Sequence, residues 1–261
     1  MGLIQSLNED RAEPRVSTAD IGRDSSLSAR VLQVANSPLY ARPQPIASIE
    51  EAAIVLGSRT MRTLALAAGV TGQFSFGRHA EGFDLRGFWL HAIATAACAR
   101  VLGRHAGVNT DIAFAAGLLH DIGRIALAAC CADRYAEVLA VKRRRDCSDL
   151  EAERDVLGID HATVGQAVVQ RWKFPRVIQE AVASHHAPPA AEALSLAALV
   201  HVSDVIIHAL DVAGAEDERV GLMDPAAWGR LDMGWPEFQD RLAEIEREAK
   251  AAAALIAGPH A

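Results

Sequence analysis

Seven histidine and aspartate residues with metal-binding side chains lie in predicted helices of this 261-residue chain. His120 and Asp121 are neighbours in the sequence GLLHDIG, near the end of an apolar run. Side chains of adjacent helical residues diverge by about 100°. They can still share a dinuclear centre, because an imidazole binds one ion and a carboxylate can bridge two. We expect Gly123 to let the backbone leave the helix close to such a centre.

Five further candidate ligands lie on other predicted helices. They are His91, His161, His185, His186 and Asp204. Asp204 stands in the apolar run LVHVSDVI, where a buried carboxylate is costly unless it is paired or binds a metal. Each residue alone has a structural explanation, as a core histidine, a first-turn residue or the partner of an arginine. Together they favour a metal site, and imidazole and carboxylate ligands suit Fe, Mn, Zn, Co or Ni without discriminating among them.

The elements that must position these residues are all predicted to be α-helices. Long apolar faces predict helices over 88–102, 111–122, 125–144, 194–210 and 236–256. Ser48 with Glu51 and Ser148 with Glu151 have the spacing of capping boxes, and Asp160 can cap a helix that runs to about residue 172. No long run alternates with period two, and no Asn-Gly or Asp-Gly hairpin signal occurs. The chain is therefore predicted to be all-α.

Composition excludes several classes of protein. With 51% hydrophobic, 23% charged and 5% aromatic residues, the chain is neither fibrous nor grossly disordered. A net charge of −7 argues against bulk nucleic-acid binding. No apolar run reaches 18 residues and the N-terminal stretch contains acids, so neither a membrane span nor export is expected. The four cysteines have no CxxC spacing and are expected to be reduced, mostly buried thiols of a cytoplasmic protein.

The order of these motifs resembles the HD superfamily of metal-dependent phosphohydrolases. His91, His120-Asp121 and Asp204 match its His…His-Asp…Asp order, and His161 with His185-His186 matches the extra ligands of the HD-GYP branch. The chain resembles the HDOD domain, an HD-related output domain, more closely still. That resemblance lies in segments 24–32, 35–37, 49–52, 56–57, 117–123, 160–165, 172–175 and 185–186.

The resemblance implies a two-lobed helical HDOD fold and a site for two divalent transition metals. We expect an N-terminal lobe over 1–75, an HD-like lobe with the metal site over 76–212 and a C-terminal loop and amphipathic helix over 213–261. The seven implied ligands are His91, His120, Asp121, His161, His185, His186 and Asp204. Two departures from HD-GYP enzymes stand out: the Gly-Tyr-Pro motif is absent, and Arg124 replaces a lysine that is usual there.

Three functions are compatible with these residues. The HDOD resemblance implies a bacterial signal-transduction regulator that acts through a protein partner. Alternatively, the chain is a metal-dependent phosphohydrolase for a nucleotide or another phosphate ester, in which Asp121 and Arg124 have catalytic roles. Metals would then lower the pKa of a water that attacks phosphorus, and Arg124 would neutralise phosphate oxygens. In the third, the metal is purely structural. The last helix is expected either to pack on the core or to form a homo-oligomer contact.

Overall fold

The computed structural model describes residues 35, 46–57, 60–61, 80–212, 214 and 219–257, with side chains up to residue 250. Every regular element in these ranges is a helix, which confirms the all-α prediction. The segments 24–32 and 36–37, on which part of the family resemblance rests, lie outside the described residues. Helix 49–57 begins after Ser48, whose Oγ accepts from the Glu51 amide at 3.1 Å. It ends at Gly57, as predicted.

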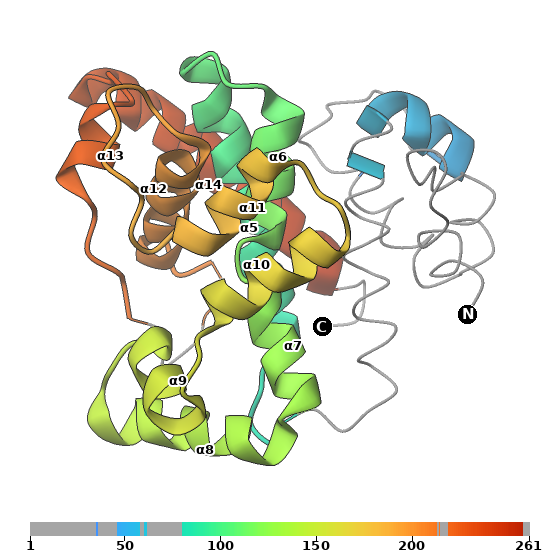
Figure 1. The fold of residues 1–261 in the computed structure, drawn as a ribbon. Coiled ribbons are helices and arrows are strands. Elements are labelled where there is room, and N and C mark those ends of the chain that lie inside the picture. Colours follow the sequence, from blue (N-terminus) through green and yellow to red (C-terminus); the bar gives the residue numbers. More distant parts are fainter. Residues whose placement is uncertain are drawn as a thin grey trace.

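A central bundle is built around one long helix (Figure 1). Its members are α5 (Leu85–His105), α6 (Thr110–Leu119), α12 (Leu196–Ala209) and α14 (Trp235–Ala257). Helix α5 packs against the other three. The last helix thus lies on the core, where Glu244 also forms a 3.0 Å ion pair with Arg104.

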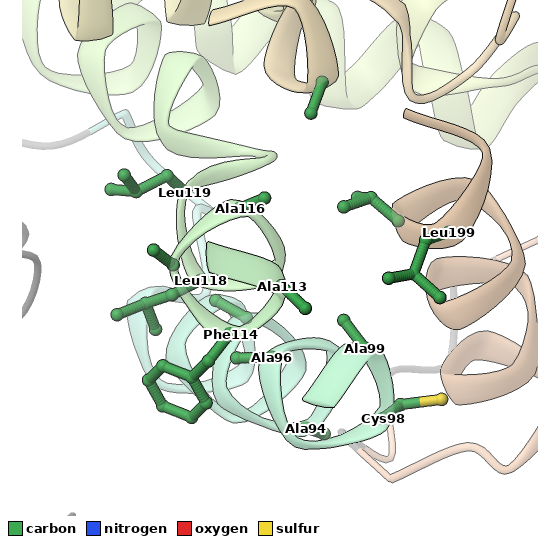
Figure 2. Close-up of a cluster of buried hydrophobic side chains, with 14 of the residues drawn as sticks. Ala94, Ala96, Cys98, Ala99, Ala113, Phe114, Ala116, Leu118, Leu119 and Leu199 are labelled. Carbon is green, nitrogen blue, oxygen red and sulfur yellow. The ribbon is translucent and has the colours of Figure 1, made fainter. Parts of the chain in front are cut away.

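Small side chains let these helices approach closely. Ala96 and Ala99 of α5 are completely buried and lie toward the alanine and leucine side chains of α6 and Leu199 of α12 (Figure 2). A Cβ atom added at Gly117 would lie 2.7 Å from the Cα of Ala96. The alanine-rich composition therefore serves close helix packing, which brings α5 and α6 near enough to share a site.

A second group of helices is attached to this bundle. They are α7 (Ile122–Cys130), α8 (Ala132–Arg145), α9 (Asp149–Leu157), α10 (His161–Arg171) and α11 (Arg176–Ser184). Helices α8 and α9 pack on each other around a separate small core that contains Tyr135 and Val138, at the lower end of Figure 1. Helix α10 packs against α7 and α11, and α11 packs against α12, so α10 and α11 connect the two groups.

The predicted caps set the starts of the helices that carry the site. Ser148 and Glu151 form a complete capping box on α9. Asp160 accepts from the Thr163 amide at 2.8 Å and caps the start of α10, whose C-cap is Trp172. These contacts satisfy amides that a first helical turn leaves without a partner. They also fix the positions of Glu153 and His161, both of which are buried.

Two predicted helix boundaries are wrong. The single helix predicted over 125–144 is two helices, α7 and α8, that meet at Cys131, whose φ of −127° and ψ of 43° are not helical. The chain turns there so that Tyr135 joins the second core, while Ile125 stays in the main one. Hydrophobic periodicity continues across the turn and does not reveal it. A short helix, α13 (Pro225–Gly229), capped by Asp224, lies in the region predicted as a loop.

One stretch, Thr110–Cys130, is long and apolar enough to cross a membrane by length and composition alone. It comprises α6 and α7, and 89% of its most apolar window is buried inside the protein, as in a core segment. The cysteine prediction is partly wrong. All four thiols are free, but only Cys98 is buried, whereas Cys130 and Cys131 are exposed.

Candidate metal centre

His120 and Asp121 lie at a break between two helices. Helix α6 ends with His120 as its C-cap, and α7 begins after Asp121, whose φ of −100° and ψ of 12° interrupt the helical path. The break therefore precedes Gly123, contrary to our expectation that the backbone leaves the helix there. Gly123 instead lies inside α7, where an added Cβ would come within 2.0 Å of the His161 carbonyl oxygen. Its missing side chain lets α7 and α10 touch.

The first group of candidate ligands surrounds one oxygen of Asp121. Oδ1 lies 3.2 Å from Nε2 of His161 and 3.4 Å from Nε2 of His185. Nε2 of His186 lies 2.8 Å from Nε2 of His161. These four side chains, from the α6–α7 junction, the start of α10 and the end of α11, place their ligand atoms within 4.8 Å of one another. Only His186 is exposed, so this position borders the surface.

The second group lies on the other side of Asp121. Nε2 of His91 is 2.9 Å from Oδ1 of Asp204 and 3.2 Å from Nε2 of His120. Nε2 of His120 is 3.5 Å from the same Asp204 oxygen and 3.6 Å from Oδ2 of Asp121. The two oxygens of Asp121 thus point to different groups of imidazoles. All seven residues predicted from the sequence converge on one region between α5, α6, α10, α11 and α12, and all of them except His186 are buried.

Buried acceptors orient three of the histidines. Nδ1 of His120 lies 2.7 Å from the Gly117 carbonyl oxygen, and Nδ1 of His185 lies 2.8 Å from that of Val182. A carbonyl oxygen can only accept, so in the neutral form of each ring Nδ1 carries the proton and Nε2 presents its lone pair to the centre. Metal-binding histidines are typically held in this way by an outer hydrogen bond.

The third oriented histidine is held by a residue that the sequence patterns did not indicate. Glu153 of α9 is completely buried and accepts from both the amide and the Nδ1 of His161, each at 2.7 Å. Its other oxygen accepts from the Tyr135 hydroxyl at 3.1 Å. Glu153 stands in the charge-rich sequence DLEAERDVL, one of several acidic residues there, so no local signal distinguishes it.

His208 is a second residue without a role in the sequence analysis. Its Nε2 lies 3.3 Å from Oδ1 of Asp204, one helical turn earlier in α12. Its ring is 4.3 Å from that of His91, centroid to centroid. The spacing of four residues between Asp204 and His208, on one face of an apolar helix, is the signal that could have found it.

The carboxyl groups remain charged although they are buried. Burial by itself would raise the pKa of Asp121, but His120 and His161 outweigh it and hold that pKa well below its usual value. Burial likewise opposes ionisation of Asp204, and the close imidazoles of His120, His208 and His91 hold its pKa well below its usual value. The region thus offers two buried anions to a cation.

The imidazoles differ from one another. Burial lowers the pKa of His91 and of His185, which favours the neutral form that binds metals. Burial would do the same to His161, but the carboxylates of Glu153 and Asp121 outweigh it and raise its pKa to about 10. A metal ion at Nε2 of His161 would take the place of that proton.

Three buried atoms in this region suit a metal ion. Oδ1 of Asp121, Oδ1 of Asp204 and Nε2 of His185 are shielded from solvent and have no hydrogen-bond partner of good geometry. Buried polar atoms without such partners are costly, and a bound ion would satisfy them. Carboxylate oxygens and neutral imidazole nitrogens are suitable donors for divalent transition metals. The residues present therefore fit a metal centre.

Arg124, which the sequence analysis placed beside a phosphate, is held by carboxylates in the structure. Its guanidinium donates to Oδ2 of Asp121 at 3.2 Å and lies 3.6 Å from Oδ1 of Asp149. The residue is buried on the inner face of α7. Its charge therefore offsets that of the two carboxylates, and its role toward a phosphate stays a prediction.

Comparison with known families identifies the fold. The sequence profile of the HDOD domain matches residues 1–188. The chain belongs to the HDOD family. An HDOD domain protein of unknown function from Geobacter sulfurreducens has a similar structure, with a TM-score of 0.70 and 22% identity over 98% of this chain and 90% of that one.

Two other solved structures resemble this HDOD protein. A candidate phosphohydrolase from Shewanella amazonensis has a TM-score of 0.70 and 25% identity, covering 98% of this chain and 91% of that one. The MmoQ response regulator from Methylococcus capsulatus has a TM-score of 0.52 and 26% identity, covering 92% of each chain.

Curated relatives of the chain are longer proteins. An uncharacterised Treponema pallidum protein is 24% identical over 73% of this chain, and a ribonuclease Y from Thermus thermophilus is 28% identical over 59% of it. The matched regions cover 37% and 22% of those two proteins. The chain therefore spans well under half the length of the curated relatives it matches.

Proposed function

We propose that this HDOD protein is a bacterial signal-transduction module that carries two divalent metal ions in its helical core and acts through a protein partner. The observation that carries the proposal is Asp121, a buried carboxylate whose two oxygens face two separate groups of imidazoles. A carboxylate in this position can bridge two ions.

The candidate ligands divide between the two proposed ions. Asp121, His161, His185 and His186 would hold the first ion, because their ligand atoms lie within 4.8 Å of one another. His91, His120, Asp204 and the second oxygen of Asp121 would hold the other. When bound, such ions supply Lewis acidity and a fixed positive charge. The chain itself supplies the orientation of the rings and the exclusion of water.

A role in signalling is supported by family membership and by likeness to a response regulator that shares 26% identity. We further propose the lobes 1–75 and 76–212 and the C-terminal part 213–261 as the units of the chain, and a cytoplasmic location. A protein partner would bind to the surface of the metal lobe, and its binding would depend on whether the metals are bound. We also propose that a second copy of this chain is an alternative partner, which would make the protein a homo-oligomer.

One observation favours the alternative, a metal-dependent phosphohydrolase. The first metal position borders the surface at the exposed His186, so a phosphate ester could reach it. The candidate phosphohydrolase from Shewanella amazonensis shares this fold at 25% identity. In that alternative Asp121 would bridge the ions. The guanidinium of Arg124, which donates to Asp121, would need to reorient so that it also contacts the ester.

Metal content and turnover together test the proposal. The protein is expressed anaerobically, reconstituted with Fe²⁺ or Mn²⁺ and assayed with cyclic dinucleotides, nucleotides and p-nitrophenyl phosphate. We expect bound metal and no turnover above that of the Asp121→Asn variant. Turnover that this substitution abolishes would replace the signalling proposal with the enzyme. A reconstituted protein without stoichiometric metal would contradict both.

The purely structural role of the metal makes a different prediction for His120→Ala. If the ion only supports the fold, His120→Ala lowers the melting temperature sharply. The variant then still binds its partner at temperatures where it is folded. If the metal lobe is the signalling element, His120→Ala abolishes partner binding at temperatures where circular dichroism shows that the helices are intact. Pull-down by the tagged variant and the tagged wild type, compared at such a temperature, separates the two.

A further inference from the structure

His208 lies next to the second proposed metal position, with its ring beside that of His91. It belongs to the last full turn of α12, and its Nε2 approaches Oδ1 of Asp204 to 3.3 Å. The same oxygen is 2.9 Å from Nε2 of His91 and 3.5 Å from Nε2 of His120. Three imidazole nitrogens therefore surround one carboxylate oxygen. Separations near 3 Å are those of neighbouring donors around an ion with bonds of about 2.1 Å.

The local geometry is suited to metal binding. His91, Asp204 and His208 can place one ligand atom each within 4.8 Å of one another. Helical spacing brings Asp204 and His208 onto one face of α12, and this face meets α5 where His91 lies. The side chain of His208 is 15% exposed and that of Asp204 is 7% exposed, so the position is largely shielded from water.

We propose that His208 is an additional ligand of the second metal ion, the one held by His91, His120, Asp121 and Asp204. This inference rests on the proposed two-metal function and adds a donor that the family resemblance does not supply. The second ion then has five protein donors, whereas the first has four. An ion whose coordination is filled by protein is a structural one, and an ion with open positions accepts an external ligand.

The inference assigns different roles to the two ions. His208 closes the second ion against water and substrate, while the first ion remains open next to the exposed His186. A small anionic ligand such as phosphate would therefore enter at the first ion. A closed second ion also accords with a module that binds and signals rather than one that turns over phosphate esters.

Two substitutions with a matched control test this role. His208→Ala removes the donor, and His208→Gln keeps a polar side chain of similar length if the alanine variant does not fold. His105→Ala is the control, because its side chain is equally shielded, 17% against 15% exposed, and it contacts Leu231 and Glu237 instead of the site. Circular dichroism of the metal-free proteins establishes that each variant folds.

The readouts are Co²⁺ stoichiometry, affinity in competition with a chelator, and visible absorption. We expect wild type and His105→Ala to bind two ions each, and we expect the two affinities of the control variant to match those of wild type. For the His208 variants we expect one of the two affinities to fall at least about tenfold, since losing even an outer partner of a ligand costs 10–100-fold. The visible bands should also intensify as the coordination number of Co²⁺ falls.

Each other outcome overturns the inference. If wild type binds two ions and the His208 variants match it in affinity and spectrum, His208 is not a ligand, and the two-metal proposal survives. If the His208 variants lose both ions with unchanged folding, the five-donor assignment is wrong. If wild type binds no Co²⁺ at all, the inference and the proposed function fail together.

Discussion

Glu153 illustrates how single residues in this protein hold others in place. It is a completely buried carboxylate, and all of its described hydrogen bonds come from His161 and Tyr135. It fixes the ring of His161 so that Nε2 faces Asp121 at 3.2 Å. A carboxylate behind a metal-binding histidine orients the ring and increases its basicity. Glu153 is therefore a positioning residue for the proposed first ion.

Glu153→Gln should weaken the binding of one metal ion by about 10–100-fold, because the amide cannot match the charge that supports His161. Isothermal titration of the metal-free protein with Mn²⁺ measures this. Glu151→Gln on the same helix is the matched control: Glu151 lies at the surface and takes part only in the capping box. Glutamine also completes a capping box, so this substitution should cost less than about 1 kcal/mol of stability, from the lost charge near the helix N-terminus, and leave metal binding unchanged. Equal metal affinities in the two variants would contradict the role of Glu153.

Asp149 links residue charge to the pH dependence of stability. Burial alone would raise its pKa, but Arg124 and Lys142 outweigh it and lower the pKa to about 2. The unfolded carboxyl group has a pKa of about 3.9, so the charged form favours the folded state by about 2 kcal/mol above that pH. This contribution disappears as the pH falls from about 4 to 2.

Asp149→Asn should therefore lower the free energy of unfolding by about 2 kcal/mol at pH 7, and the difference from wild type should shrink below pH 4. Urea titrations at several pH values measure it. Asp155→Asn is the control, since its ion pair with Arg145 is about half exposed and should contribute little. A difference for Asp149→Asn that stays constant down to pH 2 would contradict the assignment.

At the scale of elements, the site depends on helices that touch without side chains between them. Gly123 of α7 and Gly165 of α10 face each other, with the Gly165 amide nitrogen 2.7 Å from where a Cβ at Gly123 would lie. This contact places His161, the first residue of α10, directly beside the α6–α7 junction that carries Asp121. The distance between two ligands of the first ion is thus set by a contact between helix backbones.

Gly123→Ala should destabilise the protein by about 3 kcal/mol and impair metal binding, because the clash is with backbone atoms that no rotamer change relieves. Gly229→Ala, at the end of α13, meets no atom within 4 Å and should change neither property. Thermal unfolding with and without Mn²⁺ compares them. A Gly123→Ala protein as stable and as metal-competent as wild type would show that the two helices are not in fixed contact.

Sequence patterns predict these elements unevenly. The starts of α9 and α10 are predicted to the residue, because Ser148 and Asp160 mark local hydrogen bonds. The break at Cys131 is not predicted, since it is caused by Tyr135 packing in a different core from Ile125. Such a turn depends on tertiary contacts that no periodicity records.

At the scale of the whole molecule, seven candidate ligands that span residues 91 to 204 come together in one buried region. Chemistry and spacing were enough to nominate them, because histidines and aspartates inside apolar helices are conspicuous. Glu153 could not be identified in the same way, because it lies in a charge-rich helix. His208 follows Asp204 by four residues in an apolar helix, which is a usable signal, but its contact with His91 depends on how α12 packs against α5.

Removal of the metal should loosen the assembly of helices around the site. Five helices contribute ligands. Without metal ions, the two carboxylates among the histidines would remain buried with less positive charge around them. We expect chelation with EDTA followed by dialysis to lower the melting temperature by several degrees, and Mn²⁺ or Fe²⁺ to restore it. Mg²⁺ should restore less, because imidazole-rich sites disfavour it. Chelation without effect on the melting temperature would argue against ions in the core.

The most direct test is the metal content of anaerobically purified protein, measured by ICP-MS for wild type, Asp121→Ala and Asp111→Ala. We expect two transition-metal ions per wild-type chain and a loss of both in Asp121→Ala, since this carboxylate is shared. Asp111→Ala, which removes an acid from the first turn of α6 away from the cluster, should keep two. A wild-type protein without stoichiometric metal after reconstitution, or an Asp121→Ala protein that retains both ions, would contradict the account.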